Sequence, residues 1–209
     1  MLKIQQSLDF YNSNVIINSL MNGFSNSIIL LGCKNCGKST HGRLLAKKEQ
    51  LPFFDTDKAI EQVYKQPFKE YYKKNGFVGL LNDEALICKK IADKVGYNKV
   101  IVATTPHIID NPLALLELRR IGNFVCLQYD INLIVKKIQQ TIHMDVDGKF
   151  TNLPSYLAVH KPKTMNQIHD ILVQIYQEKY AQYETICDKV VKIKNAPVET
   201  NFELLLKAL

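Results

Sequence analysis

The sequence of 209 residues is 46% hydrophobic, which is enough for one sizeable core and is not typical of a disordered or fibrous protein. No stretch approaches the roughly 20 apolar residues that cross a membrane, and the first residues lack the apolar run of a signal peptide, so we expect a cytoplasmic protein. The formal net charge of +7 suits an anionic partner, which could be a nucleotide, a phosphorylated metabolite or a nucleic acid.

Five short apolar runs rich in β-branched residues alternate with longer helical patterns along the chain. The runs are residues 27–31, 51–54, 99–103, 123–128 and 189–193. Such alternation is typical of an α/β protein whose parallel sheet is covered by helices on both faces. We therefore expect a single domain over residues 27–209, preceded by an extension of mixed polarity at residues 1–26.

Capping signals predict where several helices begin and end. They are Asn111 before Pro112 with Gly122 after the helix, Asp130 before a helix at 131–142, Thr164 with Gln167, and Thr200 with Glu203 before a helix at 201–207. Between two of these helices, residues 143–163 show neither helical nor strand periodicity. Because loops of this length are often active-site lids or disordered, we predict a lid loop there.

A phosphate-binding motif follows the first apolar run. Residues 32–40 read Gly-Cys-Lys-Asn-Cys-Gly-Lys-Ser-Thr, and a helical pattern comes next. In this context the glycines let the backbone wrap around a phosphate, Lys38 reaches the β- and γ-oxygens, and Ser39 offers an oxygen to Mg²⁺. We therefore predict binding of ATP and Mg²⁺, with a nucleotide site made of Gly32, Lys34, Asn35, Cys36, Gly37, Lys38, Ser39 and Thr40.

Two of the five cysteines, Cys33 and Cys36, form a C-x-x-C pattern within this motif. A redox or metal role is one interpretation, and small side chains that merely fill loop positions are the other. The pattern favours the second, because no further cysteine or histidine pair has zinc-ligand spacing and an odd number of cysteines does not make a disulfide framework.

Two carboxylates, Asp55 and Asp57, close the second apolar run. At a strand end, residues two apart point the same way, so both would face whatever lies beside the phosphate motif. A carboxylate there could hold Mg²⁺ directly or through water. The alternative is that Asp57 only caps a helix over residues 58–64.

Residues 32–40, the following Gly-Arg-Leu-Leu-Ala at 42–46, and Phe-Phe-Asp-Thr-Asp at 53–57 resemble the shikimate kinase family. The resemblance implies a P-loop fold of three α/β/α layers, like that of nucleoside monophosphate kinases, with a five-stranded parallel sheet in the order 2-3-1-4-5. It also implies that Lys38 and Asp57 are catalytic, that Ser39 and Asp55 hold Mg²⁺, and that Asp57 accepts a hydrogen bond from the acceptor hydroxyl.

The acceptor half departs from the family pattern. Val78 stands where the family has an arginine for the acceptor carboxylate, and Thr105, Pro106 and His107 stand in place of three glycines. The segment 178–183 is similar to the family's third substrate-binding element, with Lys179 in place of an arginine. Residues 131–209 contain no arginine, so a lysine would also take the place of the arginine in the lid. The resemblance thus implies an acceptor site of Asp57, Phe77, Thr105, His107 and Lys179, and a lid cation at Lys149 or Lys161.

Three functional hypotheses remain open. The first is ATP- and Mg²⁺-dependent phosphoryl transfer to a hydroxyl of a small metabolite, either shikimate or the acceptor of a sister kinase. The second is a nucleotide-binding regulator that has lost phosphoryl transfer. The third, nucleic-acid binding, is disfavoured because the lysine-rich segment 65–74 is typical of a solvated helix face.

Overall fold

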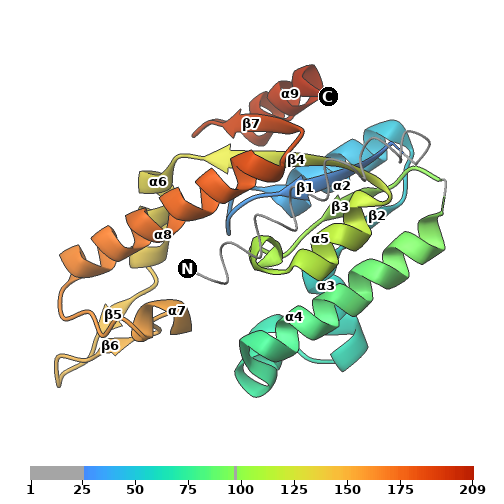
Figure 1. Ribbon diagram of the computed structural model, residues 1–209. Helices are drawn as coiled ribbons and strands as arrows, with labels where there is room; N and C mark the ends of the chain where they lie inside the picture. The colour runs from blue at the N-terminus through green and yellow to red at the C-terminus, as the bar shows by residue number, and fades with distance from the viewer. Residues whose placement is uncertain (1–25, 97) are drawn as a thin grey trace.

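The computed structural model describes residues 26–96 and 98–209 as a layered α/β protein (Figure 1). The extension expected at residues 1–26 lies, except for residue 26, outside the described residues. None of the helices in the described ranges is long and apolar enough to cross a membrane.

The central sheet has five strands, all paired in parallel. They are β1 (Ser27–Leu31), β2 (Phe53–Asp55), β3 (Ile101–Ala103), β4 (Gly122–Tyr129) and β7 (Lys189–Ile193). Their order across the sheet is β2-β3-β1-β4-β7. Since β7 is the fifth of these strands along the chain, the predicted order 2-3-1-4-5 is confirmed.

Helices cover the sheet in two layers (Figure 1). They are α2 (Lys38–Glu49), α3 (Thr56–Tyr64), α4 (Phe68–Val95), α5 (Pro112–Arg119), α6 (Ile131–Gln139), α7 (Ser155–Ala158), α8 (Met165–Ile186), α9 (Val198–Ala208) and the 3₁₀ turn η1 (Ile108–Asp110). Helix α2 contacts α9, β1 and β3, while α5 and α8 contact β4 and α4 packs on α5. The inner strands are buried as continuous apolar runs, as expected for a parallel sheet covered on both faces.

Several predicted helix starts are confirmed by side-chain caps. The side chains of Asn111, Asp130 and Thr164 accept hydrogen bonds from the backbone N–H groups of Ala114, Leu133 and Gln167, respectively. Each bond satisfies a donor that the first helical turn leaves without an intrahelical partner.

The start predicted at Thr200 is wrong, because α9 already begins at Val198 after Pro197. The fixed backbone of proline suits the entry to a helix, so Pro197 is the stronger signal. Gly122 does not end the preceding helix either. That helix ends at Arg119, and Gly122 is the first residue of β4.

Residues 143–163 are more ordered than the sequence predicted. Strands β5 (His143–Met144) and β6 (Phe150–Thr151) form an antiparallel hairpin, and α7 follows it. The Asp145 side chain accepts hydrogen bonds from the backbone N–H groups of Asp147 and Lys149 and so closes the hairpin turn. The expectation that this segment contains neither helix nor strand was therefore wrong, because two-residue strands are too short to show a period. The lid role of this segment remains a prediction.

Strand β4 approaches β1 closely at Gly122. A Cβ atom on this residue would lie 2.1 Å from the backbone oxygen of Ser27. We expect Gly122→Ala to lower the free energy of unfolding by about 1–3 kcal/mol, as overpacking does elsewhere.

The measurement is the midpoint of urea denaturation, with Asn123→Ala as the matched control. Asn123 is the next residue of the same strand and is exposed, so its substitution should change stability by no more than about 0.5 kcal/mol. Equal midpoints for the two variants would contradict the close approach.

Candidate active site

The phosphate motif forms the connection from β1 to α2, and both of its glycines have backbone conformations that other residues rarely adopt. Gly32 has a φ of +136° and Gly37 a φ of +92°. A Cβ atom on Gly32 would also lie 2.6 Å from the backbone oxygen of Leu127 in β4. These positions therefore require glycine, and they place the loop at the amino terminus of α2, where backbone N–H groups attract anions.

Lys38 is the first residue of α2 and is 8% exposed. Its ammonium group donates hydrogen bonds to the backbone oxygens of Gly32 at 2.8 Å and Cys33 at 3.0 Å. The lysine is thus folded back over the loop, and its charge adds to that of the N–H groups. Lys34, Asn35 and Thr40 are exposed on the loop and the first turn of α2, and Ser39 is half-buried there.

His41 holds the loop from the next turn of α2. Its Nδ1 atom lies 2.9 Å from the backbone oxygen of Gly37, to which it can donate a hydrogen bond. The ring is buried, so His41 is a packed residue behind the loop.

The two cysteines of the loop are buried free thiols. Burial raises the pKa of Cys33 to about 12 and also raises the pKa of Cys36. The thiolate is the form that reacts and binds metals, so both side chains fit the interpretation as small loop residues. In residues 26–96 and 98–209, no group of three or more histidine, cysteine, aspartate or glutamate side chains is placed to hold a metal ion.

The two aspartates after β2 have different surroundings. Asp55 caps α3, because its side chain accepts a hydrogen bond from the Lys58 N–H at 3.3 Å, and it lies 3.6 Å from the Arg43 guanidinium. The alternative that Asp57 caps this helix is therefore wrong. Asp57 lies in the first turn instead, and its Oδ1 is buried without a hydrogen-bond partner among the described residues.

The carboxyl group of Asp57 is consequently destabilised in its charged form. Burial raises its pKa from 3.8 to about 6, although the positive charge of Lys38 acts in the opposite direction. An unpartnered carboxylate oxygen close enough to feel the lysine charge is a ready acceptor for a hydroxyl group or a cation.

A second buried carboxylate, Glu84 of α4, was missed by the sequence reasoning. It accepts hydrogen bonds from the Thr105 hydroxyl at 2.6 Å and from the Asn111 amide at 2.9 Å. Burial raises its pKa to about 7 in spite of these bonds. Its place in the sequence, four residues from each of the buried residues Leu80 and Cys88, was a signal that it lies on the apolar face of the helix.

A cavity of about 330 Å³ opens beside the phosphate loop. Its lining comes from the loop (Cys33, Lys34), α4 (Tyr72, Phe77), the β3–α5 connection (Pro106, His107, Asp110), α7 (Tyr156) and α8 (Ile175, Tyr176, Lys179). The ring of His107 stacks on Tyr72 and meets the ring of Phe77 edge-on. This volume and this mixture of aromatic and polar groups are typical of a site for a small molecule.

Three of the expected acceptor residues, Phe77, His107 and Lys179, line this cavity. Thr105 is not among the described residues that line it, because its hydroxyl group is turned to Glu84 and its N–H donates to the Thr56 hydroxyl. Asp57 is not among them either, and its carboxyl group is largely buried where the charge of Lys38 acts on it.

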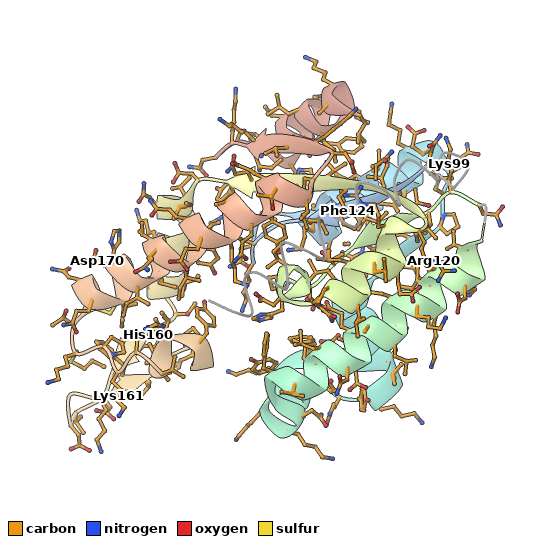
Figure 2. The ribbon with its side chains drawn as sticks, in the orientation of Figure 1. Lys99, Arg120, Phe124, His160, Lys161 and Asp170 are labelled. Atoms are coloured by element: carbon orange, nitrogen blue, oxygen red, sulfur yellow. The ribbon has the colours of Figure 1, made fainter. Side chains whose placement is uncertain are left out.

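The two lysines expected in the lid are exposed. Lys149 lies in the turn between β5 and β6, and Lys161 has a left-handed backbone with a φ of +47°. Figure 2 shows Lys161 and its neighbour His160 in the segment that carries the hairpin, well apart from Phe124 in the sheet.

Comparison with known proteins gives one consistent relationship. The sequence model of the shikimate kinase family matches residues 34–209. The shikimate kinase of Desulforudis audaxviator is 32% identical over 114 residues, which are 54% of this chain and 59%, less than two thirds, of that enzyme. The shikimate kinase of Clostridium botulinum strain Eklund 17B is 25% identical over 166 residues, which are 79% of this chain and 87% of that enzyme.

Solved structures of low sequence identity share the fold. Shikimate kinase from Bacteroides thetaiotaomicron aligns with a TM-score of 0.64 at 18% identity, over 87% of this chain and 96% of that chain. Shikimate kinase from Acinetobacter baumannii in complex with shikimate aligns with a TM-score of 0.64 at 19% identity, over 90% and 94% of the two chains.

The buried Glu84 predicts a pH dependence of stability. Its pKa in the folded protein is about 7 against an ordinary 4.5, so its contribution to stability is fully present below pH 4.5 and is lost as the pH rises to about 7. Glu84→Gln removes this titration. We therefore expect the free energy of unfolding of the variant, relative to wild type, to rise by on the order of 3 kcal/mol between pH 4.5 and 7.5.

Denaturant unfolding at several pH values measures this difference. Glu70→Gln is the matched control, because Glu70 is an exposed residue of the same helix. Its difference from wild type should stay flat over this range. A flat difference for Glu84→Gln as well would show that Glu84 keeps its ordinary pKa.

Proposed function

The chain belongs to the shikimate kinase family, and from this premise we propose that it transfers the γ-phosphoryl group of ATP to a hydroxyl group of shikimate or a related small metabolite. The observation that carries the proposal is that Lys38 is folded over the phosphate loop and that its charge acts on Asp57, whose Oδ1 is buried without a partner among the described residues. The proposed acceptor site is the cavity lined by Cys33 and Lys34 of the same loop together with Asp57, which is not among the described residues that line the cavity.

The phosphate loop and Lys38 bind and orient the nucleotide in this proposal. Backbone N–H groups at the start of α2 and the lysine ammonium hold the β- and γ-phosphates, whose charge they partly neutralise. To do so, the ammonium exchanges its hydrogen bonds to the carbonyl groups of Gly32 and Cys33 for bonds to phosphate oxygens. Lys34, Asn35, Cys36, Ser39 and Thr40 complete the proposed nucleotide site.

The oxygen atoms of Ser39 and Asp55 suit a hard cation, and Mg²⁺ held there would neutralise the charge on the transferring phosphoryl group. The fit is supported by Asp55 Oδ2, whose contact with Arg43 is long at 3.6 Å and leaves lone pairs for another ligand. Asp55 keeps its other role, the cap of α3, through Oδ1.

Asp57 acts on the acceptor. Above pH 6 its carboxylate is ionised, accepts the hydrogen bond of the attacking hydroxyl group at Oδ1, and turns the hydroxyl oxygen toward the γ-phosphorus. As the new P–O bond forms and the bond to the β–γ bridging oxygen breaks, the hydroxyl proton passes to Asp57.

Residues 27–209 serve as one kinase domain, and Lys149 or Lys161 supplies the cation of a lid formed by residues 143–163.

The first test is Mg²⁺-dependent release of ADP from ATP in the presence of shikimate. We expect Lys38→Ala to lower turnover at least ~100-fold, because it removes a charge aimed at the transferring group. Lys47→Ala, an exposed lysine of the same helix, is the control and should match wild type. If the two variants are equally active, Lys38 has no part in transfer. Retained ATP binding without turnover on any hydroxylated acceptor would favour a nucleotide-binding regulator.

The pH profile tests Asp57. Turnover in wild type should rise with pH through about 6, where the carboxyl group ionises, and then level off. Asp57→Asn should lower kcat by about 10²–10⁴-fold and remove this rise, with ATP affinity retained. A variant that loses rate but keeps the rise near pH 6 would assign the titration to another group.

A further inference from the structure

An ion pair lies in the wall of the acceptor cavity. The Lys179 ammonium donates a hydrogen bond to Asp110 Oδ2 at 2.8 Å, and both side chains are mostly buried, with 20% and 32% exposed. His107 Nδ1 lies 3.7 Å from the same aspartate oxygen. Burial alone would raise the pKa of Asp110, but the neighbouring His107 and the charge and hydrogen bond of Lys179 outweigh it and hold this pKa below its ordinary value.

The ion pair decides the charge of this part of the cavity. Among the described residues that line the cavity, the lysines are Lys34 and Lys179, and Asp110 is the one carboxylate. Lys34 belongs to the exposed tip of the phosphate loop, so Lys179 is the cation on the side of α8. Asp110 neutralises it.

A ligand that carries a carboxylate would have to compete with Asp110 for this ammonium. If the ligand carboxylate displaced Asp110 from the ammonium, Lys179 would only exchange one carboxylate for another. Asp110 would be left partly buried without its strongest partner, and this loss would weaken binding of the ligand. An uncharged ligand avoids this competition. The other groups of the wall suit such a ligand, because Tyr72, Tyr156 and Tyr176 combine apolar ring faces with hydroxyl groups that donate and accept hydrogen bonds.

We propose that Asp110 is a specificity-determining residue that neutralises Lys179 and so makes the cavity select an uncharged polyhydroxylated acceptor over one that carries a carboxylate. This inference rests on the proposed function, whose substrate class it narrows. The selection works by disfavouring the competing ligand as well as by fitting the preferred one.

The test uses shikimate and its methyl ester, which have the same hydroxyl groups and differ in charge. Wild type should phosphorylate the ester with the higher kcat/KM. Asp110→Asn frees the ammonium and should raise kcat/KM for shikimate about tenfold or more, while the value for the ester changes little. Asp110→Ala, tested in parallel, frees the same ammonium if the amide variant folds poorly.

Two further variants distinguish the effect of breaking the ion pair from the effect of removing one negative charge from the protein. Adding Lys179→Met to Asp110→Asn should abolish the gain for shikimate, because the gain depends on the freed ammonium. Asp93→Asn makes the same charge change at a surface cluster with Lys89 and Arg120 and should leave the preference for the ester unchanged.

Equilibrium binding of both probes, in the presence of a non-hydrolysable ATP analogue, is measured alongside turnover. If the preference for the ester and its reversal in Asp110→Asn hold in binding but neither probe is phosphorylated, the proposed transfer fails and the role of Asp110 stands. If wild type prefers shikimate, if the preference is unchanged in both Asp110 variants, or if the ester does not bind, the specificity role is overturned.

Discussion

The parallel pairing of β1 with both β3 and β4 is the constraint on which the rest of the site depends. Because these strands run in the same direction, the chain segments that leave them emerge at one edge of the sheet. Thr104 ties the segment that leaves β3 to the end of β1, since its backbone N–H and its hydroxyl group both donate to the Leu30 oxygen. The phosphate loop and the wall of the acceptor cavity are thereby held side by side.

Buried carboxyl groups also shape the site, although burial destabilises their charged form. Glu84 links Thr105 to Asn111 and thus fixes both ends of the segment that carries His107 and Asp110. Because burial raises the pKa of Glu84, its carboxyl group is protonated more readily than an exposed glutamate. Asp57 carries the same cost, and its Oδ1 has no hydrogen-bond partner among the described residues. This difference fits a structural role for Glu84 and a role toward a ligand for Asp57.

The sequence predicted those parts of the structure that depend on local chemistry. The glycines of the phosphate loop, the apolar strands and the caps at Asn111, Asp130 and Thr164 each act within a few residues, so their patterns could be interpreted directly. Contacts between distant residues left no such pattern. The pair of Lys179 with Asp110 joins residues 69 positions apart. Thr105 was expected in the acceptor site because it stands where the family has glycines, and nothing local indicated that its hydroxyl group binds Glu84.

The two halves of the candidate site differ in what holds them. The phosphate loop relies on backbone N–H groups and on glycines at positions 32 and 37, where a side chain is excluded by conformation or by space. The acceptor cavity touches the loop at Cys33 and Lys34, and the rest of its wall relies on side chains from α4, the β3–α5 connection, α7 and α8. A substitution in its wall can therefore change the charge of the cavity without moving the loop. In the function proposed here, phosphoryl transfer and acceptor choice therefore depend on separate groups, and the ion pair of Lys179 with Asp110 acts on the second alone.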